Sequence, residues 1–191
     1  RIVYDTGSWV LQMLRGMMDD SVFFDILKTY AWDSRWTYGS VRTENFQEIC
    51  ESKSGLDLDR FFDQWLYYPY FPDYKYSWNA DALESSQYNV KVTIEQVQNS
   101  IVYEMPIELV FLFARGKDTS LVVQNNQSIQ SYSFIFNVTP QNLLLDPNRW
   151  ILRYTQEDVS GSFTNRIKVG PNPFPTSSSQ NATIKILHDG Q

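Results

Sequence analysis

Hydrophobic residues recur at helical spacing through the first part of the chain. Apolar side chains that lie one, three and four positions apart share one face of an α-helix. This spacing predicts four helices, at about residues 6–18, 21–36, 43–54 and 57–68. Short helices joined by short connections favour antiparallel neighbours packed in a layer.

Residues that favour helix ends support these boundaries. Asp19, Asp20 and Ser21 supply a stop for the first helix and an N-cap for the second. Thr43 and Asp57 can cap the third and fourth helices, because their side-chain oxygens accept hydrogen bonds from free N–H groups of the first turn. Gly55 favours a C-terminal stop, since glycine adopts the left-handed conformation at low cost. Pro69 cannot continue a helix and ends the fourth one.

Beyond Pro72 the period of the hydrophobic pattern changes to two, which is typical of strands with one buried face. Turn-forming residues separate the apolar stretches. Strands are predicted at residues 74–78, 88–94, 107–113, 121–123, 132–138, 143–145 and 150–152. This arrangement predicts an α+β multidomain chain, with an N-terminal all-α helical subdomain followed by an antiparallel β-sandwich.

The sandwich has a second interpretation, as a carbohydrate-binding module with aromatic residues that stack on sugars. Alternation places most of its aromatic residues on the buried face, which favours a role in the core. The sequence also shows no cluster of carboxylates or amides there that would bind hydroxyl groups.

Composition narrows the class of protein. Aromatic residues make up 16% of the chain, which favours a well-packed globular protein over a disordered one. The net charge is -6 and basic residues are not clustered, so nucleic acid is not an expected partner. No apolar run reaches membrane-spanning length. The chain begins at Arg1 without a signal peptide, and we expect it to be a piece of a longer protein.

A single cysteine, Cys50, cannot form a disulfide within the chain. It shares an apolar helical face with Phe46 and Ile49. We therefore expect a buried structural thiol.

The first residues hold the candidate for chemistry. Tyr4 stands three residues before Gly7 and next to the predicted first helix, whose packed face carries Trp9, Val10 and Met13. We expect Tyr4 at or just before the first turn, where its phenol can point into a cleft. The alternative is a structural role, in which Tyr4 packs at the helix start as a hydrophobic staple.

Tyr-x-x-Gly followed by Trp-Val-Leu-x-Met-Leu-Arg resembles the segment downstream of the zinc site in gluzincin aminopeptidases, the family of aminopeptidase N and leukotriene A hydrolase. The resemblance implies that Tyr4 is catalytic and donates a hydrogen bond to the oxyanion of the tetrahedral intermediate. One preorganised donor of this kind contributes about 3 kcal/mol to lowering the barrier. The family usually has lysine at the position of Thr6.

Later stretches resemble the same family. Gly-Leu-Asp-Leu at residues 55–58, then Phe61-Phe62 and Gln64-Trp65, is similar to the end of its catalytic domain. The Leu-Leu-Leu-Asp-Pro stretch at 143–147 is similar to the end of the small immunoglobulin-like sandwich that follows it. The resemblance implies a catalytic-domain end at 1–72 and a sandwich domain at 73–155.

The acids Asp57, Asp59 and Asp63 have a possible interpretation as a calcium loop. They lack the glycine and the terminal glutamate of that motif. A helix start with acidic residues favoured by the helix dipole is the better interpretation.

Zinc hydrolysis in this family requires His-Glu-x-x-His on one helix, with two histidines that bind the metal and a glutamate that acts as base. This chain has one histidine, His188. We therefore expect zinc in the full-length protein, bound upstream of Arg1, and none bound by this fragment. The implied partners are peptide substrates and the upstream catalytic half of the same protein.

Residues 156–191 are expected to be a linker and the beginning of a further domain. Pro171-Asn172-Pro173-Phe174 resembles the start of the sorting domain on proteins exported by the type IX secretion system of Bacteroidetes. This implies a secreted or cell-surface bacterial protein. The alternative is a surface-exposed, proline-rich linker.

Together these features predict the C-terminal part of a secreted zinc-dependent aminopeptidase, inactive as a fragment. Two other functions stay open. One is a non-catalytic binding or scaffold relative, and the other is a free-standing sugar- or peptide-binding sandwich on a helical base.

Overall fold

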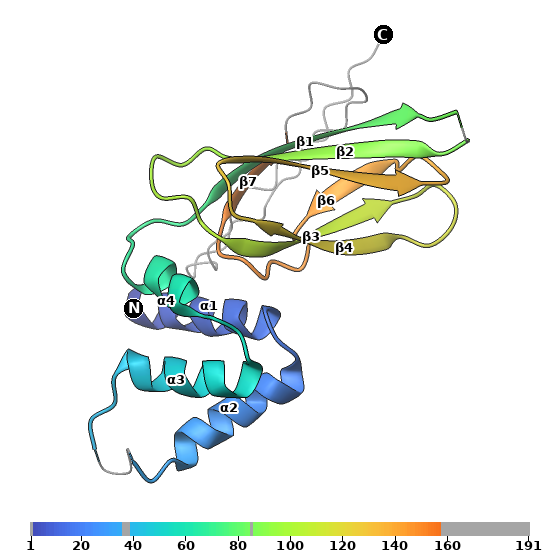
Figure 1. The fold of residues 1–191 in the computed structure, drawn as a ribbon. Coiled ribbons are helices and arrows are strands. Elements are labelled where there is room, and N and C mark those ends of the chain that lie inside the picture. Colours follow the sequence, from blue (N-terminus) through green and yellow to red (C-terminus); the bar gives the residue numbers. More distant parts are fainter. Residues whose placement is uncertain (1, 36–38, 85, 158–191) are drawn as a thin grey trace, which may run out of the picture.

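Four helices followed by seven strands make up the described part of the chain, so the fold class is α+β. The computed structural model describes residues 2–35, 39–84 and 86–157, with side chains from residue 7 onward. The helices gather at one end of two β-sheets (Figure 1). The helices are α1 (Ile2–Gly16), α2 (Asp20–Trp32), α3 (Thr43–Ser54) and α4 (Asp59–Leu66).

The four predicted helices are confirmed, with shifted ends. The first helix starts at Ile2, four residues earlier than predicted, and ends at Gly16. The second ends at Trp32, because Asp33 is already in an extended conformation. Gly55 is the predicted C-terminal stop, with a φ of 71° in the left-handed region. Among the described helices, none is both long enough and apolar enough to cross a membrane.

Asp19, one of the three residues predicted to supply a stop and an N-cap, is the N-cap of α2. The predicted caps Thr43 and Asp57 each lie one residue away from the observed N-caps, which are Arg42 and Leu58. Thr43 is the first helical residue, because the Asn45 side chain accepts a hydrogen bond from the backbone N–H of Arg42 at 3.0 Å. Asp57 lies one residue before the N-cap and accepts a hydrogen bond from the backbone N–H of Asp59 at 3.1 Å. Asp57 therefore still satisfies an N–H group of the first turn of α4, although it is not the N-cap.

The strands form two sheets. One has the order β5-β2-β1-β7 and the other the order β4-β3-β6. The strands are β1 (Asp73–Ala82), β2 (Tyr88–Gln96), β3 (Met105–Leu112), β4 (Thr119–Asn125), β5 (Ile129–Phe136), β6 (Asn142–Leu145) and β7 (Tyr154–Glu157). Phe111 of β3 contacts both Phe134 and Phe136 of β5, so the two sheets face each other across aromatic rings.

The last predicted strand was wrong. Residues 150–152 belong to the irregular connection between β6 and β7, and the strand follows at Tyr154. Residues 156–157, which the sequence assigned to a linker, are therefore part of β7. This strand pairs with β1 in parallel, so the sheets are not wholly antiparallel as predicted. The immunoglobulin-like topology and the domain boundaries stay predictions.

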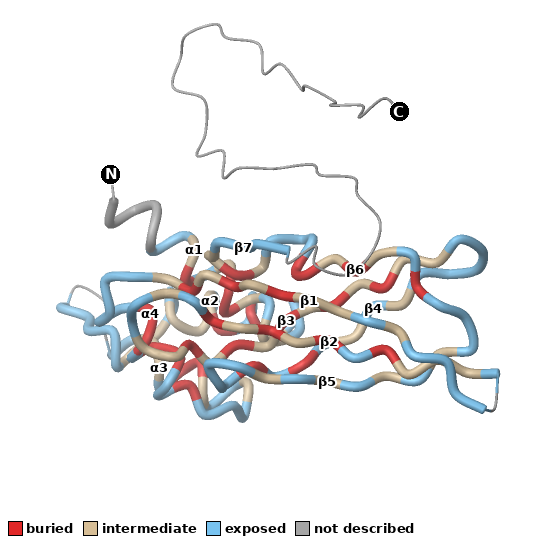
Figure 2. The backbone as a smooth tube through the Cα atoms, turned by 90° about the horizontal axis from the view of Figure 1, so that it is seen from above, coloured by how far each residue is buried: buried red, intermediate tan, exposed pale blue. Residues whose placement is uncertain are grey.

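The core lies between the sheets and continues into the helices. Figure 2 shows buried stretches along the inner strands and exposed stretches at their far ends. The alternating patterns of β2 and β3 bury every second residue, as the period of two predicted. Buried residues of α1, α2, α3 and α4 belong to the same cluster as those of the sheets.

Helix α4 joins the helical layer to the three-stranded sheet. The Gln64 amide donates to the carbonyl of Glu104 at 2.9 Å, and its carbonyl oxygen accepts from the backbone N–H of Glu104 at 2.9 Å. Next to it, the indole N–H of Trp65 lies 3.3 Å from the sulfur of Met105. Both contacts fix the helix against the start of β3.

Candidate functional site

Tyr4 lies in the first turn of α1, as expected, since the helix starts at Ile2. Its side chain is outside the described side chains, so its catalytic role stays a prediction. Helical periodicity puts position 4 in one row with Ser8 and Leu11, which are both exposed.

The C-terminal half of α1 is held firmly. Val10, Met13 and Leu14 are buried in the core, and the sulfur of Met13 lies 3.5 Å from the backbone nitrogen of Leu152. Position 4 stands six residues before Val10, which is about 9 Å along a helix axis. The backbone at position 4 therefore belongs to a helix whose C-terminal half packs in the core.

The connection between β6 and β7 is built around Asp146, which is fully buried. Its carboxylate accepts hydrogen bonds from the backbone N–H groups of Trp150 at 2.8 Å and Ile151 at 3.2 Å, and from Nε of Arg153 at 2.9 Å. Burial raises the pKa of this carboxyl, and the Arg153 guanidinium opposes that shift. These bonds fix the turn that presents Trp150 to α1.

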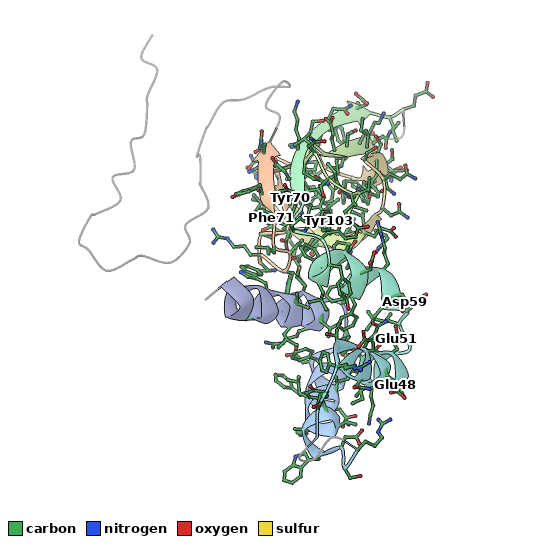
Figure 3. All side chains as sticks on the ribbon, turned by 90° about the vertical axis from the view of Figure 1, so that its left-hand side faces the viewer. Glu48, Glu51, Asp59, Tyr70, Phe71 and Tyr103 are labelled. Atoms are coloured by element: carbon green, nitrogen blue, oxygen red, sulfur yellow. The ribbon has the colours of Figure 1, made fainter. Side chains whose placement is uncertain are left out.

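Three carboxylates converge within the described residues, on the outer side of α3 and the start of α4. Glu51, Asp57 and Asp59 each place one oxygen within 4.8 Å of the other two, and Figure 3 shows Glu51 and Asp59 close together. The Gln47 amide donates to Glu51 at 3.0 Å and to Asp59 at 2.6 Å. Because these oxygens already accept local donors, the group serves to fix the α3–α4 connection.

The rejected calcium loop is not assembled as one site. Asp63 pairs with Arg60 at 3.4 Å on the next turn of α4, while Asp57 and Asp59 face Glu51.

Cys50 is buried, and burial raises the pKa of its thiol to about 12. His188 lies outside the described residues.

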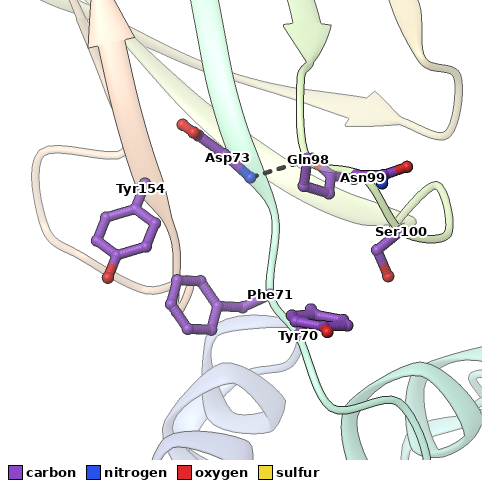
Figure 4. Close-up of a pocket in the computed structure, with 7 residues that line it drawn as sticks. All are labelled: Tyr70, Phe71, Asp73, Gln98, Asn99, Ser100 and Tyr154. Carbon is purple, nitrogen blue, oxygen red and sulfur yellow. Dashed lines mark hydrogen bonds between the residues drawn. The ribbon is translucent and has the colours of Figure 1, made fainter.

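A hollow of about 320 Å³ lies where the helical layer meets the first sheet (Figure 4). Tyr70, Phe71 and Tyr154 line one side, and the loop residues Gln98, Asn99 and Ser100 line the opposite side, with Asp73 between them. The sequence analysis found no cluster of carboxylates or amides in the sandwich, whereas this hollow brings Asp73, Gln98 and Asn99 close to aromatic rings. Tyr70 and Tyr154 are far apart in sequence, and only the pairing of β7 with β1 brings them together.

A second hollow, of about 480 Å³, lies between the α1–α2 turn and the three-stranded sheet. Most of its charged groups already have partners. Arg15 forms two hydrogen bonds of 2.7 Å with Asp20, and Glu108 accepts from Ser120 and Asn148. Few charged groups that line this hollow are therefore left to bind a ligand.

The described part of the chain is thus a helical layer that packs against one end of two β-sheets (Figure 1). This fold can be compared with those of known proteins. No protein-family model matches the sequence, and no curated protein matches it. The fold is similar to the crystal structure of Legionella pneumophila aminopeptidase A in complex with aspartic acid, with a TM-score of 0.63 and 18% sequence identity.

That similarity covers 82% of this chain but 18% of the Legionella chain. The chain thus spans less than a fifth of the length of the aminopeptidase that it resembles. At this identity the likeness concerns the fold, which is related to that of an aminopeptidase.

Proposed function

We propose that this chain is the C-terminal part of a secreted, zinc-dependent aminopeptidase that hydrolyses N-terminal residues from peptides. The observation that carries the proposal is the likeness in fold, over 82% of the chain, to part of an aminopeptidase. The motif from Tyr4 to Gly7 and the helix that follows support the same assignment.

In this proposal Tyr4 stabilises the tetrahedral oxyanion. A phenol has a pKa near 10, so it is a neutral donor at pH 7 and can donate a hydrogen bond without losing its proton. Its contribution depends on being held in place before the charge develops. The packing of Val10, Met13 and Leu14 supports this requirement, because it holds the helix that carries Tyr4.

The 191 residues do not fit a catalytic zinc site. They contain one histidine, and the three carboxylates that converge on α3 and α4 already accept local hydrogen bonds. Any zinc ligands would come from another part of the protein, and this chain alone should be inactive. Its helices would form one wall of the substrate cleft, and its sheets would support that wall.

The test compares Tyr4→Phe with wild type in the full-length protein. We expect kcat to fall about 100-fold, with zinc content unchanged, because one oxyanion donor is lost. Tyr67→Phe, the same change at an exposed tyrosine after α4, is the matched control and should leave kcat unchanged. Unchanged turnover in Tyr4→Phe would exclude the role of Tyr4, and hydrolysis by the fragment alone would contradict the need for the rest of the protein.

A non-catalytic relative is the second candidate, and Thr6 in place of the usual lysine favours it. The two candidate functions predict different sequences in the part of the protein before Arg1. His-Glu-x-x-His in the part of the protein before Arg1 supports the enzyme, whereas its loss there supports a binding or scaffold role.

A further inference from the structure

We propose that the hollow formed by Tyr70, Phe71, Tyr154 and the loop 98–100 binds a neutral pyranose sugar ring. This inference does not depend on the proposed peptidase function. It rests on the exposure of the aromatic rings, the rigidity of the segments that carry them and the charge of the groups around them.

The aromatic side offers two accessible rings. The side chain of Tyr70 is 63% exposed and that of Tyr154 is 45% exposed, although tyrosine rings usually pack at least in part. Phe71 supports Tyr154 from beneath, with ring centroids 4.8 Å apart and planes tilted by 50°. Flat, accessible rings of this kind suit the C–H face of a sugar, which is apolar and rigid.

Hydrogen bonds fix both sides of the hollow. The Tyr103 hydroxyl donates to the carbonyl of Tyr70, and the backbone N–H of Tyr154 donates to the carbonyl of Pro72 at 3.0 Å. On the loop side, Gln98 accepts from the backbone N–H of Asp73 at 3.1 Å and donates to the carbonyl of Ile101 at 2.9 Å. A binding site that is already ordered loses less conformational entropy when a ligand binds.

The polar groups around the hollow favour a neutral, hydroxyl-rich ligand. Asn99 and Ser100 are exposed, and the Asn99 amide forms no hydrogen bond with the described residues. Asp73 is the charged residue of the lining, and no lysine or arginine lines the hollow within the described part of the chain. A carboxylate without a cation disfavours phosphate and acidic ligands, whereas amide, hydroxyl and carboxylate groups all bind sugar hydroxyls.

The size of the hollow agrees with a single ring. Its volume of about 320 Å³ is near the lower end of the roughly 300–1,000 Å³ found for small-molecule sites. Two accessible rings and a few polar groups predict weak binding, with a Kd on the order of millimolar.

The test uses the whole chain and four probes, the methyl glycosides of glucose, galactose, mannose and N-acetylglucosamine. We expect at least one of them to shift the ¹H–¹⁵N resonances of residues 98–100 and the aromatic resonances of Tyr70 and Tyr154. No shift with any of the four at tens of millimolar would overturn the proposal. Binding of a proline-rich peptide without binding of a glycoside would also overturn it, because aromatic grooves bind such peptides too.

Variants then locate the site. Tyr70→Ala should weaken binding about fivefold to tenfold, because a stacking ring is lost, and Tyr70→Phe should keep most of it. Asn99→Ala, which leaves the aromatic rings in place, should also weaken binding. The matched controls are Tyr67→Ala and Asn126→Ala, which change exposed residues outside the hollow. Equal affinity in Tyr70→Ala and Tyr67→Ala, with folding confirmed by the same spectra, would overturn the assignment.

Discussion

Gly16 of α1 lies directly against the indole ring of Trp150. A Cβ atom placed on Gly16 would stand 2.9 Å from Cε3 of Trp150, closer than real Cβ atoms approach their neighbours. Trp150 in turn is held by the bond from its backbone N–H to the buried carboxylate of Asp146. The contact therefore connects the last turn of α1 to the turn that follows β6.

Gly16→Ala should destabilise the protein by about 1–3 kcal/mol, because the added methyl group overpacks the contact with Trp150. Gly7→Ala in the same helix is the matched control. Apart from the local helix backbone, no atom of the described side chains lies within 4 Å of its added Cβ, so it should stabilise the protein by about 0.5–1 kcal/mol through helix propensity. Urea unfolding followed by circular dichroism measures both changes, and two stabilising substitutions would show that Trp150 moves aside at no cost.

Gln64→Met should destabilise the protein by about 2–4 kcal/mol, although the side chains have similar volume. Gln64 is fully buried, and its loss leaves the N–H and carbonyl of Glu104 without their partner. Gln47→Met is the control, since the Gln47 amide bonds to carboxylates that water also reaches, and it should cost less than about 1 kcal/mol. Equal losses in urea unfolding would contradict the special role of Gln64.

The sequence allowed most elements to be predicted, for a physical reason. Periods of 3.6 and 2 record which face of each element is buried, so α3 and β3 followed directly from their apolar positions. Strand β7 could not be predicted this way. All four of its residues are exposed, and its pairing with β1 is a long-range, parallel contact that leaves no local pattern.

Candidate functional residues, too, could be predicted only where a local pattern marks them. A motif with local spacing singled out Tyr4, whereas the hollow beside Tyr70 was missed. The pattern at Pro69 and Pro72 indicated only a helix end. The aromatic rings of the hollow come from the link after α4 and from β7. These segments are far apart in sequence, so no local pattern predicts that the rings meet.

The ion pair between Arg15 and Asp20 should make the free energy of unfolding depend on pH. Two hydrogen bonds of 2.7 Å from the guanidinium hold the pKa of Asp20 below its ordinary value. A carboxyl whose folded pKa is lowered contributes stability above its unfolded pKa of about 3.9, and this contribution is lost as the pH falls through the folded pKa. The difference in stability between wild type and Asp20→Asn should therefore be present at pH 6.5 and shrink towards pH 2.5.

Urea unfolding at the two pH values measures that difference, and a ¹³C titration of the Asp20 carboxyl measures the pKa itself. In Arg15→Leu the carboxyl should titrate closer to its ordinary value. A stability difference that grows as the pH falls would contradict a lowered pKa for Asp20.

The buried hydroxyl of Tyr74 should oppose folding. Tyr74 is fully buried at the start of β1, and its hydroxyl has no hydrogen-bond partner among the described residues. A buried polar group without a partner costs about 1–3 kcal/mol, so Tyr74→Phe should leave stability unchanged or raise it by about 1 kcal/mol. Tyr103→Phe is the matched control, because the Tyr103 hydroxyl donates to the carbonyl of Tyr70, and it should lower stability by about 1 kcal/mol. Urea unfolding of the two variants distinguishes these outcomes, and a large loss in Tyr74→Phe would reveal a partner for its hydroxyl.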